Sequence, residues 1–452
     1  MVNCEIKKNL YSNKDINILA IVLVAISLFL IGFASYSGYQ SYFYTLLWFF
    51  VINQFCDNES RRNNYIYFHF FLILAICLYF IQKAQFPNYM GLSGPYGTDD
   101  LNYYAGLDAR VTYPIPRIDI ANDNTLSPFI NLLYLPKIID SIDIIIFNIL
   151  GIAFIPYLTN KTSYAFLCDK KAAHLAERLI LFCPFMMSIG LVIMRDVLCA
   201  SFVLAAFQCF KNKRFVYFVL FAGILLYLKL GYLVFLCIII SGYLYTHERL
   251  VSRSKASTFL KISIAATILL IVFFVYILPN LAIITGGRLT SESLFRESFI
   301  DYLQGNNDNS TLVRIYDLPL LIRLPALIIA FLVLPPLSPN FIFEGHFSVG
   351  AFMQNFVTPV YWFFIYIYFF DFCFSFKNLS IRAKGLFYVV LVLALALGMI
   401  SLQARHKVVL MPFIYMIISY AMKNNLTKYR FLSVPSILLF VIAQIAFFYS
   451  RY

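Results

Sequence analysis

The longest polar stretch of the chain, residues 84–127, carries residue types that can move a proton. Asp99 and Asp100 are adjacent there, among glycines and aromatic residues. A carboxylate that is partly desolvated beside a second one holds its proton more tightly and suits a general base. The alternative is structural, because Thr98, Asp99 and Asp100 are all favourable at the N-terminus of a helix that begins at Leu101. The residue types leave both interpretations open.

The same stretch also carries two cations, Arg110 and Arg117, within reach of an anionic ligand. A loop of more than about 15 residues without regular structure usually carries function or is disordered. Disordered segments are poor in aromatic residues, and this one is rich in tyrosine. We therefore expect residues 84–127 to fold as a cap over an active site.

Two further cations interrupt apolar sequence elsewhere in the chain. Arg195 can bind phosphate oxygens through two parallel hydrogen bonds, which suits a diphosphate. Its alternative role is an ion pair with Asp196, in which Asp196 caps the following helix and Arg195 extends towards water. Lys229 lies between two apolar segments, where phosphate contact and an extension to the membrane surface are equally compatible with the sequence.

A third basic group lies near the C-terminus. Arg405, His406 and Lys407 are consecutive on the side of the membrane where cations are normally scarce, so a local anion would explain them. The alternative is that this turn faces the other side. Glu344 and His346 are residue types that bind metals, but a single such pair predicts a surface loop instead. We expect neither a metal nor a cofactor.

Composition determines the elements that must position these residues. Hydrophobic residues make up 61% of the 452 residues, charged residues only 13%, and the mean hydropathy is +0.79. A soluble domain has about 25% charged residues. Apolar runs near the length that crosses a bilayer recur along the whole chain, without the alternation typical of a barrel. The predicted fold class is all-α, a polytopic transmembrane helix bundle of about 12 to 14 spans.

Basic clusters between the apolar runs set the predicted topology. The clusters around Arg61, Lys211, Lys384 and Lys423 should all be cytoplasmic. This places residues 84–127 and a second polar loop, residues 285–317, on the outer face of one integral-membrane domain. The net charge of +13 is thus explained by topology, and we expect no nucleic-acid partner. The nine cysteines form no CxxC pair, so neither a zinc site nor a disulfide framework is indicated.

Individual segments give sharper structural expectations. Residues 35–41 should form a short outer loop, and residues 126–139, which contain two prolines, an interfacial or re-entrant helix. A crossing over residues 143–158 should be followed by a basic inner segment, residues 161–178. Residues 215–245 are too long for one crossing and are interrupted at Lys229, which predicts a helical hairpin with its tip outside.

Three short motifs, GTDDLNYY, MRDVLCASFVLAAF followed by KNKRF, and QARHKVVLMPFIYMIISYAM, follow one another in this layout. The pattern resembles bacterial polysaccharide polymerases of the Wzy type, which join repeat units of O-antigen in lipopolysaccharide biosynthesis. It is similar also to the wider GT-C class of membrane glycosyltransferases. GT-C enzymes usually carry their acidic loop directly after the first span, whereas here it follows the third, which favours the polymerase.

The resemblance implies an enzyme of the bacterial inner membrane that uses an oligosaccharide on undecaprenyl diphosphate as its donor, with a chain-length regulator protein as a partner. It implies a base or acceptor-orienting role for Asp99 or Asp100, and diphosphate binding for Arg195 and Arg405. Arg110, Arg117, Lys229 and His406 are the further candidates for contact with the diphosphate or glycan. The alternatives are a GT-C transferase with a polyprenyl-linked donor, and a flippase or transporter for lipid-linked glycans, which would show internal repeats and broken helices.

Overall fold

The computed structural model describes residues 13–85, 126–251 and 346–424, apart from 137, 139, 193 and 401–403, together with isolated positions in 319–343 and 434–442. The elements of the first half are α1 (Asn13–Ala34), α2 (Tyr36–Asn53), α3 (Asn58–Gln85), α5 (Leu126–Leu133), α6 (Ser141–Ala153), α7 (Ile155–Leu167), α8 (Lys170–Leu181), α9 (Pro184–Gly190), α10 (Arg195–Lys211), α11 (Phe215–Leu228) and α12 (Leu230–Val251). The later ones are β1 (Ile342–Phe343), β2 (His346–Phe347), α18 (Val349–Phe352), the π-helix η4 (Met353–Val357), α19 (Thr358–Phe374), the 3₁₀ helices η5 (Phe376–Asn378) and η6 (Ala404–Val409), α20 (Ile381–Ile400) and α21 (Met411–Lys423).

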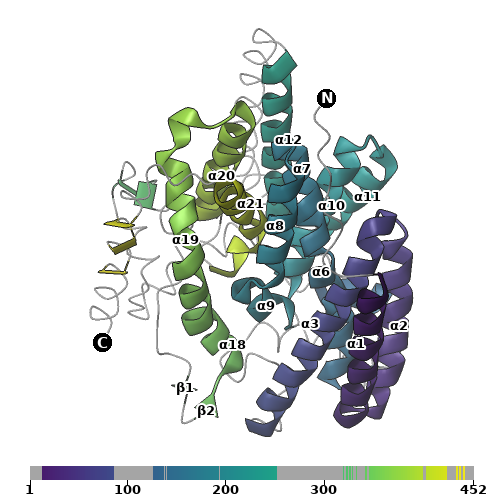
Figure 1. The fold of residues 1–452 in the computed structure, drawn as a ribbon. Coiled ribbons are helices and arrows are strands. Elements are labelled where there is room, and N and C mark those ends of the chain that lie inside the picture. Colours follow the sequence, from purple (N-terminus) through teal and green to yellow (C-terminus); the bar gives the residue numbers. More distant parts are fainter. Residues whose placement is uncertain are drawn as a thin grey trace, which may run out of the picture.

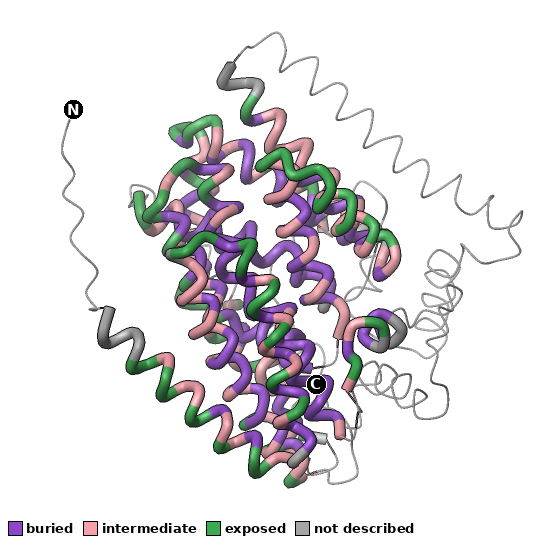
Figure 2. The backbone as a smooth tube through the Cα atoms, turned by 90° about the vertical axis from the view of Figure 1, so that its right-hand side faces the viewer, coloured by how far each residue is buried: buried purple, intermediate pink, exposed green. Residues whose placement is uncertain are grey.

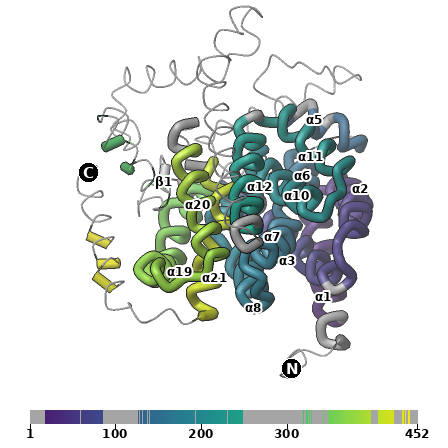
Figure 3. The backbone as a smooth tube through the Cα atoms, turned by 90° about the horizontal axis from the view of Figure 1, so that it is seen from above, coloured from purple at the N-terminus to yellow at the C-terminus, as the bar shows by residue number. Residues whose placement is uncertain are grey.

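The described helices form one bundle. Helices α1, α2 and α3 lie along one side of it, α19, α20 and α21 along the other, and α7, α8, α10 and α12 between them (Figures 1 and 3). The two-residue strands β1 and β2 pair antiparallel, with Ile342 opposite Phe347 and Phe343 opposite His346. The described part of the chain is therefore helical almost throughout, as the composition predicts.

Polar residues at helix ends fix where several of these helices begin. Asp140 and Asp143 form a capping box at the start of α6, and Asp169 accepts hydrogen bonds from the backbone N–H groups of Lys171 and Ala172 at the start of α8. Such caps satisfy N–H groups that the first turn of a helix leaves without partners. They place the helix boundaries within the apolar sequence.

The predicted hairpin at Lys229 is confirmed. Phe221 of α11 contacts Phe202 of α10, and Phe218 contacts Phe210, so these two helices run antiparallel. Tyr243 of α12 contacts Phe207, closer to the end of α10, so α12 turns back and runs parallel to α10. Lys229 is the one residue between the two arms, with an extended backbone at φ −169° and ψ 106°.

Helix α10 therefore has an Arg195 end and a Lys211 end, which its 17 residues separate by about 24 Å at 1.5 Å per residue. Lys229 lies at the Arg195 end. Helix α20 runs the other way, because Gly385 near its start lies against Thr246 near the end of α12, whereas Val389, further along α20, lies against Gly242. Each polar group described below belongs to one of these two ends.

Close packing of α12 against α20 depends on two glycines. A Cβ at Gly385 would overlap the Thr246 hydroxyl, and a Cβ at Gly242 would overlap Val389. Small residues let helix backbones approach closely in membrane proteins, where packing replaces the hydrophobic effect between helices. These contacts hold the Lys211 end of α12 firmly against the start of α20.

One of the predicted segments is wrong, and a second is longer than predicted. Residues 35–41 form no loop, since α2 begins at Tyr36 after a single break at Ser35, whose hydroxyl caps it. The crossing predicted for residues 143–158 extends through α6 and α7 to Leu167, and α8 begins at Lys170, so residues 161–178 are mostly helical. The lysines indicated an inner segment, but a charged side chain can extend from a helix end and does not stop the helix.

Among the described residues, three helical segments are long and apolar enough to cross a membrane: Ser60–Gln85, Ser141–Leu167 and Val349–Phe374. A fourth is added if α8 and α9, bent by 55° at their junction, count as one span. Large apolar side chains face outwards on α1 and α11, where Val216 is 81% exposed (Figure 2). Such continuous exposed apolar surface is typical of helices that face lipid.

Candidate functional site

A buried carboxylate lies at the Arg195 end of the bundle. Asp196 is in the first turn of α10 and is 1% exposed. The positive end of the helix dipole favours a carboxylate in this position. Tyr232, in the first turn of α12, donates a hydrogen bond of 2.9 Å from its hydroxyl to Asp196 Oδ1. The parallel course of α10 and α12 places the two first turns side by side.

The linker between α20 and α21 adds an imidazole to this carboxylate. His406 belongs to η6 and is 5% exposed, and its Nε2 lies 3.4 Å from Asp196 Oδ1. The Nζ of Lys229, at the hairpin tip, lies 2.5 Å from the same nitrogen. We call Arg195, Asp196, Lys229, Tyr232 and His406 the Asp196 cluster.

The geometry around His406 Nε2 allows a proton to occupy either of two positions. A neutral imidazole carries hydrogen on only one nitrogen. If Nε2 carries it, Nε2 donates to Asp196, and Lys229 beside it must then be the neutral amine, because two N–H donors do not bond to each other. If Nε2 is without hydrogen, it accepts from the Lys229 ammonium instead. The Lys229–His406–Asp196 arrangement can thus accept and pass on a proton.

Arg195 closes the cluster towards the hairpin. Its Nη1 donates a hydrogen bond of 3.2 Å to the carbonyl oxygen of Leu228, the last residue of α11. This bond satisfies one of the carbonyl groups that a helix end leaves without an intrahelical partner. Arg195 therefore ties the start of α10 to the tip of the hairpin.

The Asp196 cluster combines one carboxylate with two cationic side chains, the guanidinium of Arg195 and the ammonium of Lys229. The next residue after His406, Lys407, is also buried at 5% exposure. A guanidinium and an ammonium are the side-chain groups that bind phosphate oxygens, so this end of the bundle suits an anionic ligand.

The pKa of Lys407 leads to a testable pH dependence of stability. Lys407 lies in η6, between the helices α20 and α21, and burial lowers the pKa of its ammonium to about 7 from its usual 10.5. Between these values the unfolded chain binds one more proton than the folded protein, so stability rises with pH across this window. Below about pH 7, Lys407 is protonated in both the folded and the unfolded state, and the folded protein bears the full cost of the buried charge.

We expect the apparent Tm of the purified protein to rise between about pH 7 and about pH 9, and Lys407→Met to remove most of that rise. Lys384→Met is the matched control, because Lys384 is half-buried at the other end of α20 and donates to the carbonyl of Lys377. Thermal unfolding followed by intrinsic fluorescence measures both. An equal rise of Tm with pH in the Lys407→Met and wild-type proteins would contradict the assignment of this pH dependence to Lys407.

A second buried carboxylate at this end is a structural element. Asp143 accepts hydrogen bonds from the hydroxyls of Ser37 and Ser41, at 3.1 and 2.8 Å, and from the backbone N–H of Asp140 at 3.1 Å. A carboxylate with three donors, two of them on the neighbouring helix α2, suits a packing role. We assign Asp143 to the attachment of α2 to α6.

The structure brings together three of the residues that the sequence singled out: Arg195, Lys229 and His406. Arg405 precedes His406 in η6, and its side chain lies outside the described residues. The candidates of the first polar loop, Asp99, Asp100, Arg110 and Arg117, also lie outside them, as does the second loop, residues 285–317. The described boundaries of the first loop are the end of α3 at Gln85 and the start of α5 at Leu126.

Two cluster residues were missed as candidates. The sequence favours a capping role for Asp196, but the N-cap of α10 is Met194 and no side chain caps this helix. Only the packing of α12 and η6 shows the contacts of Asp196 with Tyr232 and His406. The break in the apolar sequence from Lys229 to Tyr232, at the hairpin tip, is the feature of the sequence from which Tyr232 could have been predicted. Within the described part of the chain, no group of three His, Cys, Asp or Glu residues is arranged to hold a metal.

Comparison of the chain with protein-family models, with curated proteins and with solved structures finds no match in any of the three. What the protein does must therefore be inferred from the chemistry of the Asp196 cluster and from the bundle that carries it.

Proposed function

We propose that the protein is a membrane glycosyltransferase, a polymerase that joins oligosaccharide repeat units carried on undecaprenyl diphosphate. The observation that carries the proposal is the buried Asp196 cluster, in which a carboxylate–imidazole pair lies beside a guanidinium and an ammonium at one end of an apolar helical bundle. A diphosphate supplies the anion that these cations suit, and an acceptor hydroxyl supplies the proton that the pair can take.

In the proposed reaction, an acceptor hydroxyl oxygen attacks the anomeric carbon of the donor sugar. The new C–O bond replaces the bond from that carbon to the diphosphate, and undecaprenyl diphosphate leaves with the bonding electrons. Arg195 and Lys229, with Arg405, the residue before His406, stabilise the charge that develops on the leaving oxygens. The Asp196–His406 pair receives the hydroxyl proton.

Asp99 and Asp100 are the alternative source of the base, and Arg110 and Arg117 further ligands of the glycan or diphosphate. All four belong to the expected outer loop, which would cover the same end of the bundle, because α3 leads into it and α5 follows it. Gln85, the last residue of α3, accepts a hydrogen bond from the backbone N–H of Phe347 in β2. A partner protein that regulates chain length would act on this enzyme at the outer face.

Deletion of the gene tests the proposed function directly. Loss of a polymerase leaves single repeat units on the lipid core, whereas loss of a flippase or of an earlier enzyme leaves the core undecorated. The glycan pattern on a gel separates the two, and wild-type protein supplied in trans must restore the long chains. An undecorated core would contradict the polymerase.

The proposal places the chain in the bacterial inner membrane with about 12 to 14 spans and with the Arg195 end outside. Lys161, Lys211, Arg382 and Lys423 all lie at the opposite end, where ion pairs join Lys161 to Asp57 and Lys423 to Asp169. This segregation follows the distribution of cations in membrane proteins, with the basic end cytoplasmic.

Thiol labelling tests this orientation. Leu135 is 69% exposed between α5 and α6, at the Arg195 end, and Asn212 is exposed in the turn after α10, at the Lys211 end. In cells whose protein lacks its native cysteines, we expect Leu135→Cys to react with an impermeant reagent and Asn212→Cys to react only after lysis. The reverse pattern would put the Asp196 cluster in the cytoplasm and rule out the proposed reaction there.

One observation favours a second candidate function, a flippase for the same lipid-linked glycans. Helices α8 and α9 are bent by 55° at Phe182 and Cys183, which separate them, and broken helices are typical of transporters. A GT-C transferase with a polyprenyl-linked donor would use the same cluster to transfer a single sugar. The deletion phenotype described above distinguishes a flippase from a polymerase. The length of the glycan distinguishes a transferase of single sugars from a polymerase.

A further inference from the structure

A cavity of about 200 Å³ lies at the Lys211 end of the bundle, remote from the Asp196 cluster. Three basic residues line it, and each comes from a helix whose other end carries or adjoins the Asp196 cluster: Lys211 ends α10, His247 lies near the end of α12, and Arg382 near the start of α20. The remaining lining residues are Tyr164, Ala165, Phe166, Cys168, Tyr243 and Thr246. We call this the Lys211 cavity.

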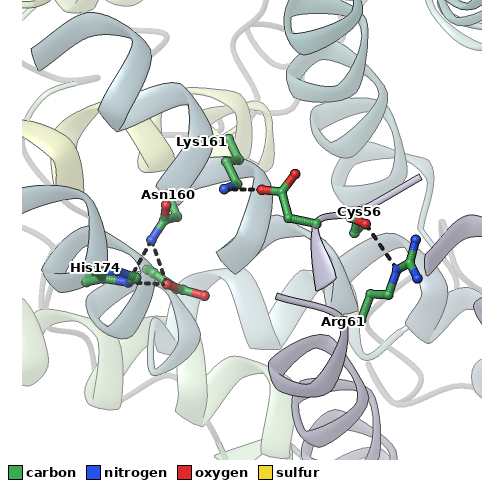
Figure 4. A network of polar contacts seen from close by, with 7 residues as sticks. Cys56, Arg61, Asn160, Lys161 and His174 are labelled. Carbon is green, nitrogen blue, oxygen red and sulfur yellow. Dashed lines mark hydrogen bonds and ion pairs between the residues drawn. The ribbon is translucent and has the colours of Figure 1, made fainter. Parts of the chain in front are cut away.

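No acidic residue is among the described residues that line the Lys211 cavity. Asp57 is close enough to Lys211 to act on its charge, but it already forms an ion pair with Lys161 (Figure 4). Asp169 lies 2.6 Å from the ammonium of Lys423. The positive charge of the cavity is thus not balanced by a carboxylate in its wall.

A further carboxylate near this end, Glu177, is also occupied. It accepts hydrogen bonds from the Tyr67 hydroxyl at 3.0 Å and from the Asn160 amide at 2.7 Å, and its Oε2 lies 3.2 Å from His174 Nδ1 (Figure 4). A carboxylate with these partners is fixed in the interface of α3, α7 and α8. The carboxylate of Glu177 is therefore held by these partners and does not balance the cations of the cavity.

The wall of the Lys211 cavity is held in place by packing. The ring of Tyr243 contacts those of Phe166 and Phe207 edge-on and stacks on His247 with centroids 6.1 Å apart. Thr246 packs against Gly385, where the absence of a Cβ brings α12 close to α20. A cavity shaped by such contacts is largely formed before a ligand binds, which lowers the cost of binding.

The rim of the cavity is open. Tyr164, Cys168 and His247 are exposed, and apolar helices extend from this end of the bundle. An entrance beside helix ends that combine cations with aromatic rings is where a lipid headgroup would meet the protein. The guanidinium of Arg382 can hold two phosphate oxygens, and the ammonium of Lys211 can add a point charge.

From these observations we infer that the Lys211 cavity binds a phosphate group, supplied by the headgroup of an anionic phospholipid. Free phosphate would present the same chemistry and is distinguished by the experiment below. The site is independent of the proposed glycosyl transfer, because it lies at the other end of α10 and shares no residue with the Asp196 cluster.

The experiment compares the full-length protein in nanodiscs of phosphatidylcholine alone, of phosphatidylcholine with phosphatidylglycerol, and of phosphatidylcholine with inorganic phosphate in the buffer. Phosphatidylglycerol should raise the apparent Tm by several degrees, because a ligand that binds only the folded state stabilises it. The double variant Lys211→Gln, Arg382→Gln should lose this rise. Lys384→Gln, which removes a cation from the same helix end outside the cavity, should keep it.

A second measurement needs no substitution in the cavity. Cys168 is an exposed thiol in its wall, so phosphatidylglycerol should slow the alkylation of Cys168 several-fold in the wild-type protein, as followed by peptide mass spectrometry. The same protection by inorganic phosphate in phosphatidylcholine would support the phosphate site with a free ion as its source. Equal rates of Cys168 alkylation under all three conditions would overturn the inference. So would an equal loss of the stabilisation by phosphatidylglycerol in Lys384→Gln and in the double variant.

Discussion

Asp196→Asn is expected to reduce chain extension by about 100-fold or more while the protein reaches the membrane at its normal level, because general bases contribute typically 10²- to 10⁴-fold. Asparagine keeps the shape of aspartate and can still accept the hydrogen bond from Tyr232. It removes the negative charge of the Asp196–His406 pair, which receives the hydroxyl proton in the proposed reaction. The length of the glycan on a gel and the rate of polymer formation in isolated membranes measure the loss.

Two matched variants show whether that loss belongs to the proton path. Tyr232→Phe removes one hydrogen bond to Asp196 but keeps the charge, so we expect a smaller loss, of about 10-fold for a hydrogen bond of about 1.5 kcal/mol. Asp169→Asn at the other end of the bundle should polymerise normally, because asparagine caps a helix almost as well as aspartate.

The expected outer loop provides the competing outcome. If Asp196→Asn makes polymer of wild-type length and either Asp99→Asn or Asp100→Asn makes none, the base belongs to residues 84–127 and Asp196 is a structural residue of the cluster. Normal polymer in all three variants would leave no base among the candidates, and would contradict the proposed mechanism as a whole.

Arg195→Lys is expected to reduce chain extension by about 10- to 100-fold, since a hydrogen bond to a charged group contributes about 1.5–3 kcal/mol and lysine loses the second one. The hydrogen bond from Arg195 to the Leu228 carbonyl makes this substitution informative. Lysine can replace a single bond to a carbonyl oxygen, so a purely structural arginine would tolerate the change. A diphosphate held at two oxygens requires the planar guanidinium.

Arg405→Lys tests the neighbouring cation in the same way, and the double variant should lose more than either single variant. Arg214→Lys, in the exposed turn after α10, is the matched control and should polymerise normally. Full-length polymer in cells that carry Arg195→Lys and Arg405→Lys together would count against a diphosphate clamp and leave Arg195 as a link between α10 and the hairpin.

Composition and charge by themselves predicted a helical protein and several of its elements. The apolar runs predicted helices, and the interruption at Lys229 predicted the hairpin of α11 and α12, because a helix period and a break in it are local properties of a sequence. The basic clusters predicted which helix ends gather together, and Lys161, Lys211, Arg382 and Lys423 do share one end. Helix boundaries were less predictable, because the lysines near the end of α7 did not stop the helix.

Tertiary structure alone decided what the polar residues contact. Arg195, Lys229 and His406 each stood out in the sequence as a cation against the apolar pattern. The sequence paired Arg195 only with its neighbour Asp196, and no local signal placed Tyr232 or His406 beside that carboxylate. Those contacts exist because α10 and α12 run parallel and the linker η6 returns to the same end, which depends on how helices distant in the chain pack. The same packing joins Lys211, His247 and Arg382 around one cavity, since the end of each helix is fixed by its neighbours and not by its own sequence.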